Sequence, residues 1–396
     1  MPQKILNRDF VLLALSALFA ATAFMFLMPT LPIFAVSVVK LQESEVGIVV
    51  GAFSVTALVL RPFIGYAIDN YNRRVILIAA TLFFTLTLVS YLYISTLLML
   101  VLVRMFHGAS WATISTSNAT IVPDLVPANK RGEGIGFFSM SMPLAMVIGP
   151  AIALEIFNQS DSFNLVFGIA SAMGVLGLIS TIFVKMPQRE YCRRPLSLSP
   201  SALYEKRAVG ASAMQFCYTF AWSGIATFLP IYAYKNGIDN CSIFFVLYAI
   251  SVLLVRVFVR RTLDLRGPTP LIVAGYSAFA VGALLLAFTT THFTFFISGI
   301  FVGVGSGLVL PSLNTMIMNI VEPAARGKAN ATLFTSIDIG MGLGAMVSGV
   351  IVNLTSYRTN YIISAIILLL PILFYFLYEK RHYLDILEKQ RAVEHD

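Results

Sequence analysis

The chain contains twelve apolar stretches, and each has about the 20 residues that a helix needs to cross the hydrocarbon core of a bilayer. Lipid offers the backbone no hydrogen-bond partners, so a helix is the element expected for each stretch. The alternating ten-residue segments typical of an outer-membrane barrel are absent from the sequence. The predicted spans are Phe10–Ala35, Glu45–Ile68, Val75–Ser95, Leu97–Ile121, Gly134–Ile156, Phe163–Val184, Ala208–Tyr232, Ser242–Val259, Pro270–Thr289, Phe293–Met318, Ala329–Val352 and Asn360–Tyr378.

The composition excludes most other classes of protein. Hydrophobic residues make up 58% of the chain and charged residues 12%, against roughly 25% charged residues in soluble domains. Cys192, Cys217 and Cys241 are too few and too scattered for a disulfide framework or a thiolate metal site. The four histidines form no metal-binding pair at helical spacing, and no phosphate-binding P-loop is present. We therefore predict a polytopic membrane protein that is not an enzyme and has no metal site and no cofactor.

The basic residues predict the topology. Of the 27 lysines and arginines, 21 fall in segments on one side of the predicted spans, and Lys40, Lys235 and Arg358 fall on the other side. By the positive-inside rule, the first side is the cytoplasm and both termini lie there. The first span, flanked by Lys4 and Arg8, is then an uncleaved signal anchor. The net charge of +8 reports topology, and no basic domain that would bind nucleic acid remains outside the spans.

The longest polar stretch marks the boundary between two halves of six helices each. It joins the sixth and seventh spans and carries three prolines and six basic residues. We predict an N-terminal half at 1–185, a cytoplasmic linker at 186–207, a C-terminal half at 208–379 and a cytoplasmic tail at 380–396.

The two halves carry similar residues at a constant offset of 195. The pair Arg61 and Asp69 recurs as Arg256 and Asp264, and several other positions match at the same offset. No single match is informative, but their agreement predicts an internal duplication. Parallel repeats of this kind are typical of transporters whose halves are related by an axis along the membrane normal. The further matches are Gly108 with Gly303, Arg131-Gly132 with Arg326-Gly327, Ser141 with Ser336, and Gly149 with Gly344.

The connection between the second and third spans resembles the signature loop of the major facilitator superfamily, G-x-L-a-D-r-x-G-r-[RK]. Gly65, Asp69, Arg73 and Arg74 match this motif. Asp69 lies at a helix end, where a carboxylate can pair with arginines or with a facing helix N-terminus. We expect these four residues to hold one conformation closed at the inner face. The chain departs from the motif at two positions, Ala67 and Asn72.

Two further segments are similar to motifs of the proton antiporters in this superfamily. Arg104 and Gly108 in the fourth span match R-x-x-x-G, with His107 where glutamine is frequent in the family. Gly149 and Pro150 in the fifth span match the centre of g-x-x-x-G-P-x-x-G-G. Small residues there permit close helix approach, and the proline adds a local bend, so both are assigned to conformational gating.

The resemblance extends over essentially the whole chain. Pro29-Thr-Leu-Pro32 is similar to an element of twelve-helix drug–proton antiporters. The segments Gly47–Gly51, Leu60–Pro62, Arg131–Gly134 and Ile337–Gly340 resemble those of bacterial exporters of metallophores such as staphylopine. The resemblance implies the major facilitator fold, alternating access and export driven by a proton gradient.

Charged residues inside predicted spans are functional candidates, because a charge near the bilayer centre costs at least a few kcal/mol. Asp338 is the only acid near the middle of a span, and protonation would remove most of the cost of burying its charge. Arg104 keeps its charge, whereas the histidine at His107 can lose its charge near neutral pH. We assign Asp338, Arg104 and His107 to proton coupling. The alternative for each is a structural hydrogen bond or ion pair.

Polar and aromatic residues on shared helix faces are candidates for substrate binding, because aromatic faces bind amphipathic or cationic ligands. Arg61 and Arg256 occupy equivalent positions and either line the inner cavity or extend to the cytoplasmic interface. The other candidates either line a cavity or simply pack in the core. They are Trp111, Asn118, Gln215, Tyr218, Trp222 and Asn314.

The sequence thus predicts an all-α protein of the bacterial inner (cytoplasmic) membrane that exports a small molecule by proton antiport and works as a monomer. Its partners are the small-molecule substrate and the lipid bilayer. Two alternatives stay open, namely a proton-coupled importer or facilitator of a small metabolite, and a membrane sensor or scaffold that transports nothing.

Overall fold

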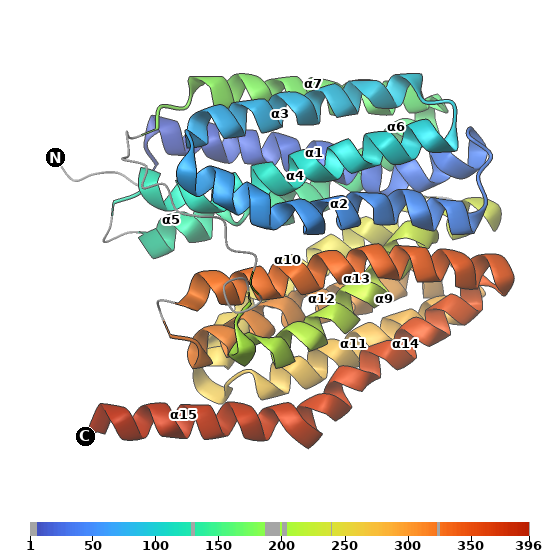
Figure 1. The fold of residues 1–396 in the computed structure, drawn as a ribbon. Coiled ribbons are helices and arrows are strands. Elements are labelled where there is room, and N and C mark those ends of the chain that lie inside the picture. The colour runs from blue at the N-terminus through green and yellow to red at the C-terminus, as the bar shows by residue number, and fades with distance from the viewer. Residues whose placement is uncertain are drawn as a thin grey trace. The chain divides into compact units, whose positions relative to one another are not determined.

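Helices occupy all twelve predicted spans in the computed structural model (Figure 1). The structure describes residues 6–127, 131–186, 199, 204–238, 240–322 and 325–395. Within these ranges the structure leaves some side chains undescribed, namely those of Asp69, 131–133, 136, 257, 260, 261, 264, 327 and 389–395. Most of the predicted linker at 186–207 lies outside the described residues. The long helices are α1 (Arg8–Ser37), α2 (Glu43–Asn70), α3 (Arg73–Ser90), α4 (Leu97–Leu125), α6 (Ser141–Ser160), α7 (Phe163–Phe183), α9 (Val209–Lys235), α10 (Ser242–Arg266), α11 (Thr269–Ala287), α12 (His292–Ile320), α13 (Arg326–Leu354) and α14 (Tyr357–Phe374).

Ten helices of the described chain are both long and apolar enough to cross a membrane. The two other predicted spans are helical but less apolar. Helix α9 has 27 residues and carries polar side chains such as Gln215 along its length. Helix α10 has 25 residues, and its second half carries several arginines and an aspartate.

The fifth predicted span is interrupted. Helix α5 (Arg131–Phe138) ends two residues before α6 begins, where one continuous helix was expected. Pro143 has no backbone N–H to donate to the carbonyl of Ser139, and its ring disfavours a regular turn there. The proline therefore separates the short α5 from the long α6.

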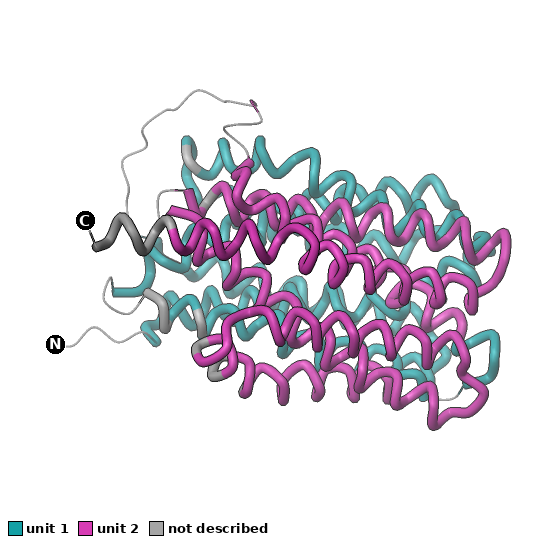
Figure 2. Tube along the Cα trace, turned by 90° about the horizontal axis from the view of Figure 1, so that it is seen from below, with its two compact units in different colours: residues 1–196, 233–242 teal, residues 197–232, 243–396 magenta. Residues whose placement is uncertain are grey.

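The chain divides into two compact units, which Figure 2 distinguishes by colour. The first comprises residues 1–196 and 233–242, and the second comprises residues 197–232 and 243–396. In the first unit, α1 packs against α6 and α7, while α4 packs against α2 and α3. In the second unit, α11 packs against α12 and α14.

Close helix contacts recur at the offset of 195 that the sequence indicates. A Cβ atom at Gly108 would fall under 3.0 Å from the carbonyl of Phe53, and one at Gly303 would fall equally close to the carbonyl of Tyr248. A Cβ atom at Gly149 would fall under 3.0 Å from the Cβ of Met25, and one at Gly344 would fall equally close to the backbone of Phe220 (residues 25 and 220 are also 195 apart). Each unit therefore uses glycine at the same place to bring two helix backbones together.

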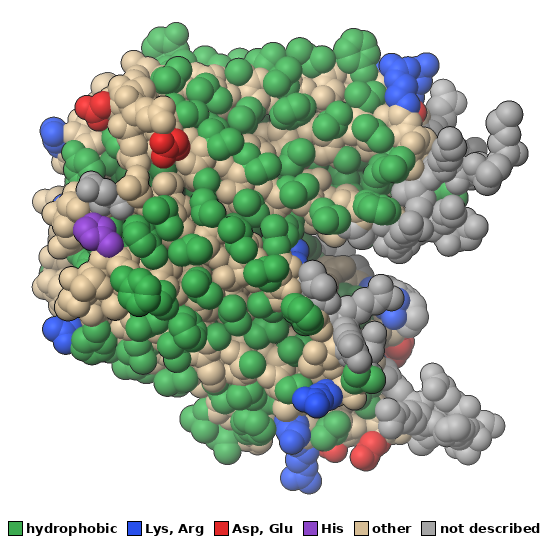
Figure 3. Space-filling model, turned by 180° about the vertical axis from the view of Figure 1, so that it is seen from behind, with side chains coloured by type: hydrophobic (Ala, Val, Ile, Leu, Met, Phe, Trp, Pro, Cys, Tyr) green, Lys and Arg blue, Asp and Glu red, His purple; other side chains and the backbone are tan. Residues whose placement is uncertain are grey.

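Large hydrophobic side chains remain on the outside of both units, as expected for helices that face lipid. Phe83, Phe106 and Leu377 are 59, 61 and 75% exposed. Hydrophobic side chains are spread across the whole face drawn in Figure 3, and most of the charged side chains visible there lie away from its middle.

The chain continues as helix beyond the last predicted span. A π-helical turn, η5 (Tyr375–Glu379), follows α14 directly, and α15 (Lys380–His395) follows the turn. Figure 1 shows the chain changing direction where α14 passes into α15. A π turn inserts one extra residue and is a frequent cause of such a bend.

Candidate functional site

The signature loop is a two-residue connection between α2 and α3. Tyr71 and Asn72 form it, and the Asn72 side chain accepts hydrogen bonds from the backbone N–H groups of Arg74 and Val75. Asparagine is a favoured N-cap because its side-chain oxygen satisfies first-turn donors. With φ at −66°, Asn72 needs none of the conformational freedom of the glycine that stands there in the family motif.

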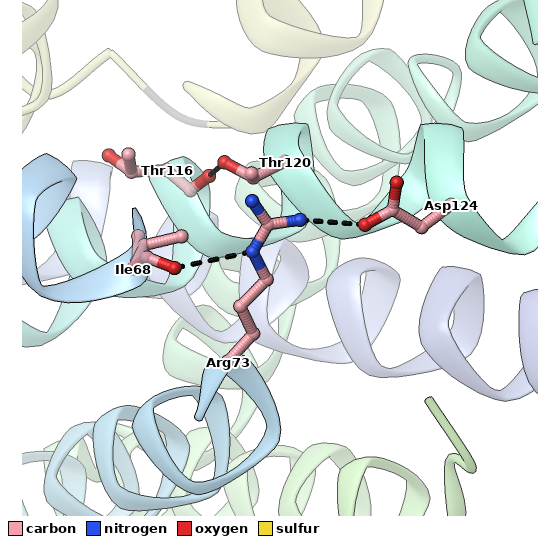
Figure 4. Close-up of polar contacts among 5 residues, drawn as sticks. All are labelled: Ile68, Arg73, Thr116, Thr120 and Asp124. Carbon is pink, nitrogen blue, oxygen red and sulfur yellow. Dashed lines mark hydrogen bonds and ion pairs between the residues drawn. The ribbon is translucent and has the colours of Figure 1, made fainter. Parts of the chain in front are cut away.

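Arg73 joins the ends of two helices (Figure 4). Its guanidinium donates from Nη1 to Oδ2 of Asp124 at 2.6 Å, and from Nε to the carbonyl of Ile68 at 3.3 Å. The Arg73 side chain is 10% exposed and that of Asp124 is 34% exposed. Ile68 lies in the last turn of α2 and Asp124 in the last turn of α4, where a positive charge is favourable. Arg73 therefore holds the last turns of α2 and α4 together at the start of α3.

Arg74 makes an equivalent contact with another helix. Its Nη2 donates to the carbonyl of Ile182, near the end of α7, at 2.8 Å. The two arginines of the motif thus fasten three helices of the first unit at one end. The side chain of Asp69 lies outside the described residues, and a Cβ atom at Gly65 would meet nothing within 4 Å.

The residues of the fifth span that were predicted to act in gating lie at a helix crossing. Gly149 and Pro150 are buried in α6, and Gly149 packs against Met25 of α1. The close approach needs a residue without a side chain at this point, as the sequence predicts.

Arg104 is buried in α4 and contacts α2. It is 6% exposed, its guanidinium carbon lies 4.6 Å from the ring centroid of Phe53, and its Nε donates to the carbonyl of Val49 at 3.4 Å. A cation over an aromatic face is attracted by the negative potential of the ring. The charge of Arg104 is therefore held inside the unit by an aromatic face and a backbone carbonyl.

His107 lies one turn further along α4 and is fully buried. Its Nδ1 is 3.1 Å from the hydroxyl of Tyr91, and its Nε2 has no hydrogen-bond partner among the described residues. Four aromatic rings surround the imidazole with centroids 4.9 to 5.9 Å away and interplanar angles of 64 to 86°. These rings belong to Phe24, Phe53, Phe84 and Tyr91.

The predicted substrate residues of the first unit lie beside this cluster. Trp111 stacks on Phe24 with ring centroids 4.7 Å apart, and Asn118 is buried two turns further along α4. Arg61 is half-buried in α2.

The predicted substrate residues on α9 pack in the second unit. Gln215, Tyr218 and Trp222 are all buried, and Trp222 stacks on Tyr248 with centroids 4.6 Å apart. Tyr218 meets the ring of Phe279 nearly edge-on at 5.5 Å. The two other candidates of this unit are exposed, namely Arg256 and Asn314.

Asp338 is 9% exposed on α13, which packs closely against α9. A Cβ atom at Gly340 would overlap Thr219, and one at Gly344 would overlap the backbone of Phe220. Asp338 and His107 belong to different compact units, so a proton relay between them stays a prediction. The described residues contain no group of three or more side chains suited to holding a metal ion.

Sequence reasoning missed three residues that the structure places at these sites. They are Asp124, which pairs with Arg73, Tyr91, which contacts His107, and Phe53, which lies under Arg104. A single acid just beyond the C-terminal end of the fourth predicted span was a usable signal for Asp124. The aromatic residues gave no signal, because phenylalanine and tyrosine are common throughout the spans.

The ion pair of Arg73 can be tested by a double-mutant cycle. Arg73→Gln and Asp124→Asn should each lower the thermal stability of the purified protein. The double variant should lose less than the sum of both, with a coupling of about 1 kcal/mol, because either single change already removes the attraction between the two side chains. Arg74→Gln combined with Asp124→Asn is the matched control and should be additive. Additive losses in the Arg73 cycle would contradict the assignment.

Ten long apolar helices in the described part of the chain, buried charge within them and glycine contacts repeated in two units define a multi-pass membrane protein. The sequence profile of the Major Facilitator Superfamily matches residues 13–239 and 211–394, and the chain belongs to this family of transporters.

Several known proteins are similar over most of the chain. The staphylopine export protein of Staphylococcus aureus is 22% identical over 348 residues, which cover 85% of this chain and 87% of that protein. A multi-drug resistance efflux pump PmrA homolog of Lactococcus lactis is 23% identical over 386 residues, covering 94 and 95%. The crystal structure of a bacterial homolog of the human lysosomal transporter Spinster, inward-facing and occupied, shares the fold with a TM-score of 0.74 at 16% identity, covering 94% of this chain and 97% of that one.

Proposed function

We propose that this protein exports a small molecule from the cytoplasm in exchange for protons. The observation that carries the proposal is the pairing of a buried permanent charge, Arg104, with a buried titratable group, His107, one turn apart in a membrane-spanning helix. Charged and titratable groups at such positions are typical of ion pathways and proton relays. The similar proteins named as efflux pumps support the direction of transport.

The proposal includes the full membrane topology. All twelve long helices cross the cytoplasmic membrane, and both termini lie in the cytoplasm. The basic residues concentrated on one side of the spans support this orientation. The two halves, 1–185 and 208–379, act within a monomer, with the linker at 186–207 and the tail at 380–396 on the cytoplasmic side.

Transport then proceeds by alternating access, in which the two halves rock about a central site. Protonation of Asp338 or of His107 changes the charge buried in a span and so favours one conformation. Substrate binding competes with the proton. The contacts of Arg73 and Arg74 stabilise the cytoplasmic ends of α2, α4 and α7 in the closed inner face.

The substrate class that fits these residues is a drug-like or metallophore-like molecule. Aromatic side chains such as Trp111 and Trp222 offer flat faces to an amphipathic ligand, and Arg61 and Arg256 offer charge to anionic groups. Asn118, Gln215, Tyr218 and Asn314 supply hydrogen-bonding groups along the same helices.

Flux measurements in proteoliposomes test the proposal. We expect an imposed pH gradient to drive a quinolone or a metal-chelating amino-carboxylate across the membrane opposite to the protons, and a protonophore to abolish the effect. Transport in the direction of the protons would indicate the importer, and equilibration that ignores the gradient would indicate the facilitator. No flux of any compound would favour the sensor or scaffold.

A histidine variant tests the role of His107 separately. His107→Gln restores the residue frequent in the family but cannot titrate, so we expect transport to persist with an altered dependence on pH. His292→Gln, at an exposed histidine at the start of α12, is the matched control and should keep the pH profile of the unaltered protein. Identical profiles for all three proteins would remove His107 from the coupling set.

A further inference from the structure

A buried stripe of three side chains marks the passage from α14 to α15. Tyr375, Glu379 and Tyr383 follow one another at intervals of four residues and are 0, 1 and 5% exposed. The intervening Leu377 and Tyr378 are 75 and 63% exposed. The π-helical turn η5 covers the first two members of the stripe, and π turns occur frequently at functional sites.

The two tyrosines fasten the stripe to neighbouring helices. The hydroxyl of Tyr375 lies 2.6 Å from the hydroxyl of Thr269, the first residue of α11. The amide of Asn319, near the end of α12, donates to the hydroxyl of Tyr383 at 3.0 Å. Both contacts are hydrogen bonds between neutral groups.

The carboxyl group between them has no such partner. Glu379 lies against Gly210, the second residue of α9, so closely that a Cβ atom at Gly210 would overlap both carboxyl oxygens. Its Oε1 is buried without a hydrogen-bond partner among the described residues, and no ion pair to Glu379 is present among them. The carboxyl of Glu379 therefore occupies the space that a side chain at Gly210 would fill.

Among the charged groups nearby, His382 lowers the pKa of the Glu379 carboxyl, but burial raises this pKa by more. His382 is exposed one turn further along, and Lys380 has its Nζ over the ring of Phe376 at 5.6 Å. Arg207, just before α9, is held by the carboxylate of Glu322 at 3.2 Å. The side chains that α11 and α12 direct at the stripe, Thr269 and Asn319, are uncharged. Burial of an ionised carboxylate without a partner is costly, so it raises the pKa of Glu379 and the packed arrangement favours the neutral acid.

We propose that Glu379 is a proton-binding site that fastens the start of α15 to the first turn of α9. The protonated carboxyl packs on Gly210. When it loses its proton, the carboxylate leaves this contact for water and the base of α15 separates from α9. The site lies outside the residues assigned to proton coupling, so the proposal does not depend on the direction or the substrate of transport.

The sign of the effect follows from linkage. The packed state binds the proton more tightly than a separated state in which Glu379 is in water, where glutamic acid has its ordinary pKa of about 4.3. Each pH unit above that value therefore raises the ratio of separated to packed protein by up to about tenfold, until the packed carboxyl also ionises. The contact is strongest at low pH and weakens as the pH rises.

Hydrogen–deuterium exchange of the full-length protein in lipid nanodiscs tests this at pH 5.5, 7 and 8.5. We expect the amides of residues 375–388 to exchange progressively faster in the unaltered protein than in Glu379→Gln as the pH rises, by about tenfold between the lowest and highest pH. Comparison at the same pH cancels the intrinsic pH dependence of exchange, because glutamine keeps the shape of the side chain but cannot ionise.

Two more variants complete the test. Glu388→Gln, at an exposed acid of α15, is the matched control and should follow the unaltered protein at every pH. Gly210→Ala should expose residues 375–388 to exchange at all three pH values, because the methyl group displaces the carboxyl. A ratio between the unaltered protein and Glu379→Gln that stays constant with pH would overturn the proposal. Slow exchange of 375–388 in Gly210→Ala, equal to that of the unaltered protein, would overturn it as well.

Discussion

Asp338→Asn is expected to abolish proton-driven transport in proteoliposomes, with accumulation falling to the level of protein-free liposomes. Asparagine has the size of aspartic acid and keeps the packing of α13, but it can neither bind nor release a proton. Asp338 is 9% exposed within a membrane-spanning helix. Burying an ionised acid there is costly, so acids at such positions are rare and usually have a function. The measurement is substrate movement under an imposed pH gradient, with counterflow of labelled substrate in its absence.

Counterflow separates a coupling defect from a folding defect. A variant that has lost only its proton site should still exchange substrate for substrate. Asp385→Asn, at an exposed acid of α15, is the control and should retain gradient-driven transport. If Asp338→Asn transports with an unchanged response to the gradient, Asp338 is not the coupling acid and the proposed mechanism must rest on His107.

Gly108→Ala is expected to destabilise the fold by about 3 kcal/mol, near the upper end of the cost of overpacking a core. The added methyl group would fall under 3.0 Å from the backbone carbonyl of Phe53, and a backbone in a helix cannot move aside alone. The higher helix propensity of alanine returns about 1 kcal/mol, which does not offset the overlap. The apparent melting temperature of the purified protein measures the loss.

The repeat supplies both a second test and a control. Gly303→Ala should cost a similar amount, because its methyl group would meet the carbonyl of Tyr248. Gly65→Ala, where nothing lies within 4 Å, should be neutral or slightly stabilising in the same assay. Equal melting temperatures for all three variants would contradict the close helix approach at Gly108.

The sequence by itself determined the class of protein and the positions of its helices. A run of about 20 apolar residues can satisfy its backbone in lipid only as a helix, so length and hydropathy suffice to locate each span. The interruption at Pro143 and the continuation of α14 into α15 were not anticipated. Mean hydropathy does not register the effect of a proline near a helix start. The charged residues near 380 end the apolar stretch, but the helix continues through them.

The signature residues were also readable from the sequence, but not what they touch. Arg73 was expected to act at the inner face, whereas its partners, the carboxylate of Asp124 and the carbonyl of Ile68, depend on where α2 and α4 end in space. In the same way, the offset of 195 predicted the duplication, and the structure showed that it preserves contacts between backbones.

Only the tertiary structure distinguished buried groups with partners from buried groups without them. In the sequence, His107 and Glu379 are both titratable residues with aromatic neighbours, and nothing there shows what surrounds either side chain in the fold. The fold gives Nδ1 of His107 the hydroxyl of Tyr91 and surrounds the imidazole with aromatic rings, whereas it sets the carboxyl of Glu379 against a glycine. Nε2 of His107 and Oε1 of Glu379 both lack a hydrogen-bond partner among the described residues. The physical reason is that the free energy of a charge depends on the side chains that surround it, and those come from helices far apart along the chain.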